Sequence, residues 1–97
     1  MINVLLVDDH ELVRTGIRKI LDEVKGFKVI GETQTGEEAV QFCRKTEPDV
    51  VLMDMNMPGI GGLEATKKII RYAPDVKVIV LTVYCEDPIP TKVMQIG

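Results

Sequence analysis

Three aspartates and one threonine follow apolar runs at the points where those runs stop. Asp8 and Asp9 come directly after the run I-N-V-L-L-V, Asp54 ends the run V-V-L-M-D, and Thr82 follows V-K-V-I-V-L. Carboxylates are oxygen ligands that suit Mg²⁺, and a carboxylate can also act as a nucleophile toward a phosphoryl group. If these runs are neighbouring strands, the four side chains predict a magnesium-dependent phosphoryl-transfer site.

Close approach of three carboxylates would cost energy. Two full charges about 5 Å apart at an effective dielectric constant near 20 repel by roughly 3 kcal/mol. Either one carboxyl group takes up a proton, or a cation lies among them. Asp54 stands alone before the turn M-P-G-I-G-G, so it is the better candidate for the nucleophile. The adjacent Asp8 and Asp9 are the better candidates for metal ligands.

Each of these residues also has an ordinary structural explanation when taken alone. Asp8 or Asp9 can lie near the N-cap of the first helix, and Asp54 can be a turn residue. Thr82 is common strand content. His10, the only histidine, is expected in the first helical turn rather than as a ligand, and without a His or Cys cluster zinc is disfavoured. Only the complete set on one rim predicts the site.

Alternating apolar and amphipathic segments predict the elements that position these residues. Strands are expected over residues 2–7, 27–31, 49–53 and 76–81, and helices over 11–24, 36–46, 63–72 and 87–94. The order βαβαβαβα predicts an α/β, flavodoxin-like, doubly wound parallel sheet with strand order 2-1-3-4. In that order the first and third strands lie about 4.8 Å apart, which brings the three acids together at one edge.

Smaller sequence signals predict how these elements pack. The residues expected to point inward are Ala39, Val40 and Cys43 on the second helix, and Leu63, Ile69 and Ile70 on the third. Lys28 suggests that the second strand lies at an edge of the sheet. Asp87-Pro88 is typical of an N-cap followed by a first-turn proline, which opens the helix expected toward Met94.

The composition excludes several classes of protein. The chain has 97 residues and a net charge of −3, which predicts one small domain and disfavours a nucleic-acid or anionic-membrane surface. No apolar run approaches the length of a membrane span, and the N-terminus lacks the pattern of a signal peptide. Cys43 and Cys85 are expected to be reduced thiols. We therefore expect a cytoplasmic protein.

The motifs L-L-V-D-D-H, D-V-V-L-M-D-M-N-M-P-G-I-G-G and V-I-V-L-T closely resemble the receiver domain of two-component response regulators, with its CheY-like fold. The resemblance extends through the whole chain with the expected spacing. The segments D-D-H-E-L-V-R-x-G-I and M-P-G-I-G-G-L-E-A-T are similar to the NarL/LuxR-type subfamily and to its GacA/UvrY group of global regulators. The resemblance implies that the chain is a phosphorylation switch rather than an enzyme acting on other substrates.

The resemblance assigns a role to each candidate residue. Asp54 matches the phosphoacceptor, Asp9 the direct Mg²⁺ ligand, and Asp8 an acid that holds the metal largely through water. Asn56 matches the position whose backbone carbonyl ligates the metal, and Thr82 the hydroxyl that hydrogen-bonds the phosphoryl group. Further matches are Pro58, which shapes the loop, and the two variable positions that tune autodephosphorylation, Asn56 and Tyr84.

The chain departs from the family at its C-terminus. The family has a fifth strand with a lysine that pairs with the phosphoryl group, then a last helix, and this chain stops at Gly97 before them. We therefore expect residues 1–97 to be an incomplete receiver domain without an output domain. The exposed edge of the fourth strand would favour a homodimer or a strand-swapped dimer.

The resemblance also implies partners. A sensor histidine kinase would donate the phosphoryl group, and a C-terminal helix-turn-helix domain of the full-length protein would bind DNA and control transcription. Three alternatives remain. An aspartyl-nucleophile phosphohydrolase usually has a second acid where Asn56 stands, and a flavin module needs a phosphate cradle that D-D-H-E-L-V lacks. A receiver-like module that only binds partners is the third alternative; the intact set of acids argues against it, but the missing lysine keeps it open.

Overall fold

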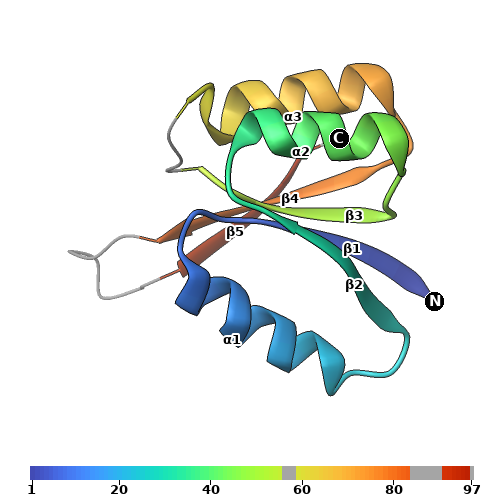
Figure 1. Cartoon of the computed structure of the whole chain (residues 1–97), viewed down its shortest axis with the longest axis vertical. Coiled ribbons are helices and arrows are strands. Elements are labelled where there is room, and N and C mark those ends of the chain that lie inside the picture. Colours follow the sequence, from blue (N-terminus) through green and yellow to red (C-terminus); the bar gives the residue numbers. More distant parts are fainter. Residues whose placement is uncertain (56–58, 84–90, 97) are drawn as a thin grey trace.

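The computed structural model describes the backbone of residues 1–55, 59–83 and 91–96 and the side chains of residues 1–55 and 59–81 (Figure 1). These parts form an α/β fold in which three strand–helix pairs precede two further strands. The elements are β1 (Ile2–Val7), α1 (Glu11–Asp22), β2 (Phe27–Thr33), α2 (Gly36–Lys45), β3 (Val50–Asp54), α3 (Gly61–Tyr72), β4 (Lys77–Val83) and β5 (Thr91–Ile96).

The sheet has the order β2-β1-β3-β4-β5. The first four strands are parallel, which confirms the predicted doubly wound order 2-1-3-4. β2 lies at one edge, as Lys28 suggested, and Lys28 itself is exposed. Each crossover between parallel strands is a helix, so the carboxyl ends of β1, β3 and β4 meet at the same edge of the sheet.

The last segment differs from the prediction. A helix was expected over residues 87–94, but Thr91–Ile96 forms β5, which pairs antiparallel with β4. Residues 87–90 lie outside the described part of the chain. The family's parallel fifth strand is not found among the described residues, and the free edge of β4 is filled by an antiparallel strand instead. Backbone groups of an edge strand need partners, and this pairing supplies them for β4.

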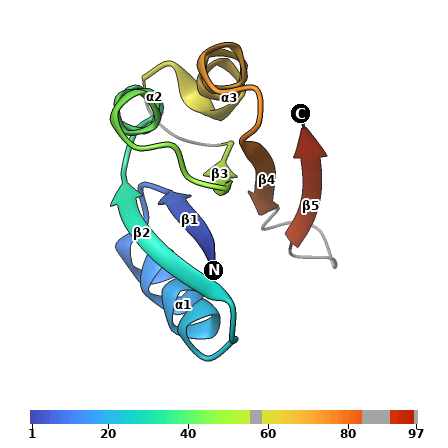
Figure 2. The same ribbon diagram turned by 90° about the vertical axis from the view of Figure 1, so that its right-hand side faces the viewer.

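The helices cover both faces of the sheet. α1 lies on one face, against β1 and β2, whereas α2 and α3 lie side by side on the other (Figure 2). The main core is between the sheet and the α2–α3 layer, and it includes Leu5, Val7, Val51, Met53, Val78 and Val80 from the strands. Ala39, Val40, Cys43 and Ile69 are buried in it as predicted, and Ile70 packs against it.

One inward position was wrong. Leu63 is 47% exposed, because α3 begins at Gly61 and buries the face that carries Gly62, Ala65, Thr66 and Ile69. On α1 an apolar residue is even more exposed: Leu12 is 84% exposed. The buried residue of this helix is the charged Arg14. Among the described residues, no helix has the length and apolar character required to cross a bilayer.

Candidate metal and phosphoryl-transfer site

Strand register brings the aspartates together. Val7 of β1 pairs with Met53 of β3, so the next residues along the two strands, Asp8 and Asp54, emerge next to each other. Asp54 in turn pairs with Leu81 of β4, one residue before Thr82. The prediction that these acids meet at one rim of the sheet is therefore confirmed by the geometry.

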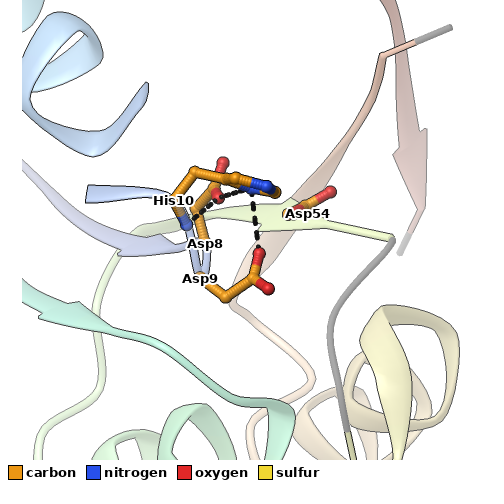
Figure 3. A group of neighbouring side chains, drawn as sticks. All are labelled: Asp8, Asp9, His10 and Asp54. Atoms are coloured by element: carbon orange, nitrogen blue, oxygen red, sulfur yellow. Dashed lines mark hydrogen bonds and ion pairs between the residues drawn. The ribbon is translucent and has the colours of Figure 1, made fainter. Parts of the chain in front are cut away.

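The cluster contains four residues. Asp8, Asp9, His10 and Asp54 each offer a ligand atom, and these atoms all lie within 4.8 Å of one another (Figure 3). Asp8 and Asp54 are buried, each with 7% of its surface exposed, whereas Asp9 and His10 are exposed. Two buried carboxylates thus form the floor of the cluster, and the exposed pair faces solvent, from which an ion or a phosphoryl donor can approach.

Asp8 is fixed by hydrogen bonds on several sides. Its backbone N–H donates to the carbonyl oxygen of Thr33 at 3.1 Å. Its carboxylate accepts from the backbone N–H of His10 at 2.7 Å. The N-cap of α1 is His10, not either aspartate, and the His10 side chain makes no capping bond. The Asp8 carboxylate instead ties the turn before the helix, as aspartates often do in turns.

The His10 ring lies beside the carboxylates of Asp8 and Asp9. Its ring Nδ1 lies 3.1 Å from Oδ1 of Asp8 and 3.0 Å from Oδ1 of Asp9. The hydrogen bond with Asp8, followed by the charge of Asp9, raises the pKa of His10 above its ordinary value. The carboxylates thus favour the protonated form of the His10 ring. His10 was expected in the first helical turn, and the position of its ring beside the acids was not predicted.

The donor set suits magnesium. Three carboxylates provide hard oxygen ligands, and Mg²⁺ is usually held by one or two carboxylates together with water and phosphate oxygens. Zinc sites are built mainly from Cys and His, and this cluster contains one histidine and no cysteine. Cys43 is a free, buried thiol in the main core, as predicted, and lies outside the cluster.

Several predicted site residues fall where their side chains are not described. Asn56, Pro58 and Tyr84 lie outside the described residues altogether. Thr82 lies within β4, opposite Lys92 of β5, but its side chain is not described. Their assigned roles therefore stay predictions.

Arg14 and Glu32 are two residues near the site that the sequence did not predict. Arg14 is buried on α1, and its Nη1 donates to the carbonyl oxygen of Asp8 at 2.5 Å. Its Nε donates to Oε1 of Glu32, near the end of β2, at 3.2 Å. The available signal was the motif D-D-H-E-L-V-R, which places an arginine one helical turn after His10. An arginine in an amphipathic helix is usually expected to be exposed to solvent, so the sequence alone did not identify Arg14 as a buried residue.

Comparison with known proteins agrees with this geometry. The sequence model of the response regulator receiver domain matches residues 4–97. The chain is 68% identical to the response regulator UvrY of Escherichia coli K12 and 57% identical to the response regulator GacA of Pseudomonas aeruginosa PAO1. Both alignments cover the whole chain but only 44% and 45% of those relatives. The chain thus spans less than half the length of the relatives it matches.

Solved structures show the same fold. A LuxR-family response regulator from Aurantimonas sp. SI85-9A1 superposes with a TM-score of 0.80 at 36% identity, over 84% of this chain and 59% of that chain. RcsB from Salmonella enterica serovar Typhimurium, bound to promoter rprA in the presence of the phosphomimetic BeF3⁻, gives a TM-score of 0.80 at 33% identity. That match covers 91% of this chain and 73% of that solved chain. The chain therefore belongs to the response regulator receiver domain family.

Proposed function

We propose that this chain is a phosphorylation switch that accepts a phosphoryl group on Asp54, with Mg²⁺ held by Asp8, Asp9, Asp54 and the backbone carbonyl of Asn56. The observation that supports the proposal is the acidic cluster, in which carboxylate oxygens of Asp8, Asp9 and Asp54 at the ends of two neighbouring strands lie within 4.8 Å of one another. Membership of the receiver family supports it. When bound, Mg²⁺ would offset the negative charge that gathers at the transferred phosphoryl group.

The side chains divide the chemistry among them. A carboxylate oxygen of Asp54 attacks the phosphorus, a new P–O bond forms, and the bond from phosphorus to the donor's leaving group breaks. With a phosphohistidine donor the leaving imidazole is released and takes up a proton. Asp54 suits this role because it lies at the end of β3 and one of its carboxylate oxygens is within 4.8 Å of ligand atoms of Asp8 and Asp9. The hydroxyl of Thr82 would then donate a hydrogen bond to the phosphoryl group and report its presence.

The wider role follows from the resemblance to response regulators. We propose that a sensor histidine kinase is the phosphoryl donor and that the full-length protein acts in the cytoplasm as a transcription regulator with a C-terminal helix-turn-helix domain. RcsB, a related structure, was determined bound to a promoter, which supports a DNA-binding output. Residues 1–97 would be the receiver part, which switches state without turning over other substrates. A homodimer remains a prediction, but the argument for strand swapping weakens because β5 pairs with the edge of β4.

Beryllofluoride binding tests this proposal without requiring covalent chemistry. We expect beryllofluoride with Mg²⁺ to raise the unfolding temperature of the chain and to shift amide signals of β1, β3 and β4. Asp54→Asn should remove both effects while keeping the fold, because the change is isosteric. If the folded wild-type chain and Asp54→Asn respond alike, the phosphoacceptor assignment is wrong. A response to Mg²⁺ alone, without one to beryllofluoride, would favour a receiver-like module that only binds partners.

A further inference from the structure

Arg14 is an unusual residue for the inner face of a helix. The arginine side chain is rarely buried unless it is paired, yet Arg14 is only 8% exposed. On the same helix, Leu12 and Ile20 are 84% and 64% exposed. α1 therefore packs on β1 and β2 with a charged side chain directed inward, although the same helix carries apolar side chains that remain exposed. A buried guanidinium needs partners, and these partners show what it holds in place.

The guanidinium of Arg14 joins three segments of the chain. It is carried by α1, donates from Nη1 to the carbonyl oxygen of Asp8 after β1, and donates from Nε to Glu32 near the end of β2. Glu32 is held from a second side by Arg18, whose Nη1 donates to Oε2 at 2.8 Å. Each carboxylate oxygen of Glu32 thus has its own arginine, and Glu32 in turn fixes the orientation of Arg14.

These contacts act on the metal site through the backbone of Asp8. Both backbone polar groups of Asp8 are hydrogen-bonded, the N–H to Thr33 and the carbonyl to Arg14. The same carbonyl belongs to the peptide group that joins Asp8 to Asp9. Fixing this peptide group therefore fixes the directions in which the two carboxylates leave the chain. Holding like charges in convergent positions before a cation arrives requires such support.

We propose that Arg14, oriented by Glu32, is a positioning residue that sets the Asp8–Asp9 peptide group so that both carboxylates converge for Mg²⁺. This inference rests on the proposed magnesium-dependent function. It assigns to the arginine of D-D-H-E-L-V-R a role beyond packing α1 on the sheet. Arg14 reaches the carboxylates only through the backbone, so it does not touch the metal or the phosphoryl group.

The test compares Mg²⁺ affinity in Arg14→Gln, Arg14→Lys and Glu32→Gln with that in Arg18→Gln, measured by calorimetry on protein shown to be folded. Loss of a group that orients a metal ligand typically weakens metal binding by about 10–100-fold, and we expect such a loss for Arg14→Gln. Arg14→Lys should also weaken binding, because one ammonium group cannot reproduce the planar two-point contact. Arg18→Gln is the matched control: it removes the other arginine on Glu32 but leaves the bond to Asp8, so its affinity should stay near that of the wild type.

A second measurement separates positioning from general stability. The backbone N–H of His10 donates to the Asp8 carboxylate, so its hydrogen exchange reports order in the β1–α1 loop without any metal. We expect faster exchange at His10 in Arg14→Gln and Glu32→Gln, with unchanged exchange in the core strand β3. If Arg14→Gln fails to fold, Glu32→Gln and Arg14→Lys still decide the question.

The outcomes distinguish this inference from the function on which it rests. If the wild type binds Mg²⁺ and the folded Arg14 and Glu32 variants bind it equally well, the positioning role is wrong. The inference also fails if these variants lose Mg²⁺ affinity only in proportion to a loss of hydrogen-exchange protection throughout the sheet. Arg14 would then support the fold in general and not the metal site. If the folded wild type binds no Mg²⁺, the proposed function fails, and the role of Arg14 toward the metal fails with it.

Discussion

Gly62 lies against Asp54 through backbone contact: a Cβ atom on Gly62 would be 2.4 Å from the carbonyl oxygen of Asp54 and 2.9 Å from Cα of Met55. The first turn of α3 and the end of β3 therefore touch where the proposed phosphoacceptor sits. Since backbone cannot yield as a flexible side chain does, any side chain at Gly62 must displace one of the two segments. The position of Asp54 thus depends on a glycine eight residues later.

Gly62→Ala should consequently destabilise the protein and disturb the site. We expect overpacking to lower the free energy of unfolding by about 1–3 kcal/mol. Gly16→Ala is the matched control, because nothing lies within 4 Å of a Cβ there and the residue is in the middle of α1. That change should stabilise the protein by about 0.5–1 kcal/mol. Urea unfolding measures the change in the free energy of unfolding for both variants. Equal changes for the two substitutions would contradict the packing of α3 against β3.

Asp9→Asn should have opposite effects with and without magnesium. Without metal, and in a His10→Ala background that lacks the ion pair between His10 and Asp9, the change removes one of three crowded negative charges, so we expect unfolding to cost about 1 kcal/mol more. With Mg²⁺ at about 100 times its Kd, the wild type should gain about 2.7 kcal/mol, and Asp9→Asn should lose most of that gain. Thermal unfolding with a chelator and with Mg²⁺ measures both effects.

Asp75→Asn provides the control for Asp9→Asn. It makes the same change of charge at an exposed residue before β4, at the opposite end of the sheet from the cluster. Its effect on stability should be the same with chelator and with Mg²⁺. If Asp9→Asn leaves the difference in stability between chelator and Mg²⁺ the same as in the wild type, Asp9 is not part of a metal site.

His10→Ala should leave Mg²⁺ binding largely intact. The ring of His10 lies beside the carboxylates of Asp8 and Asp9, where its positive form competes with a metal ion for the same charges. Mg²⁺ prefers oxygen ligands, so it should replace the imidazole rather than bind it. Loss of a true ligand or its orienting partner costs about 10–100-fold in affinity, and calorimetry that found such a loss would assign His10 to the metal.

Cys43 should make stability depend on alkaline pH. Burial raises the pKa of the Cys43 thiol from 9.0 to about 11. Between these values the unfolded thiol is ionised while the folded thiol keeps its proton, so the unfolded state gains and stability falls as pH rises from about 9. Urea unfolding of Cys85→Ser, which leaves Cys43 as the only thiol, should therefore show lower stability at pH values above about 9.

The double substitution Cys43→Ala with Cys85→Ser isolates this contribution. Tyrosine and lysine titration affects both proteins, so only the difference between their pH profiles belongs to Cys43. We expect the single variant to lose more stability above pH 9 than the double variant. Cys43 in the folded single variant should also resist alkylation that is rapid in urea. Identical pH profiles, or equal alkylation rates in the folded and unfolded states, would contradict the buried thiol.

Much of the fold could be predicted because local pattern and sheet rules agree. The run Ile2–Val7 is apolar almost throughout, as a strand covered on both faces must be, and the βαβ connections leave few topologies. That topology alone places Asp8 beside Asp54. The helix expected over residues 87–94 was wrong for residues 91–94, because Thr91–Ile96 pairs with β4 and this strand pairing outweighs a local capping signal.

The support of the site could not be predicted in the same way. Arg14 looks like any polar residue of an amphipathic helix, and its value lies in reaching the Asp8 carbonyl and Glu32 from a third element. Such a contact depends on how α1 is rotated against β1 and β2. In this rotation the apolar Leu12 is exposed and the charged Arg14 is buried, the opposite of what their side-chain polarity favours. The sequence thus indicates which side chains do chemistry more readily than which ones hold them in place.

Asp54, in its cluster of acids, is the proposed acceptor of the phosphoryl group. The most direct measurement is the intact mass of the folded chain after incubation with Mg²⁺ and a small phosphodonor, followed by peptide mapping. We predict one phosphoryl adduct on the peptide that contains Asp54, which is absent from Asp54→Asn and from samples with chelator. A folded wild-type chain without an adduct, or with the same adduct in Asp54→Asn, would contradict the claim.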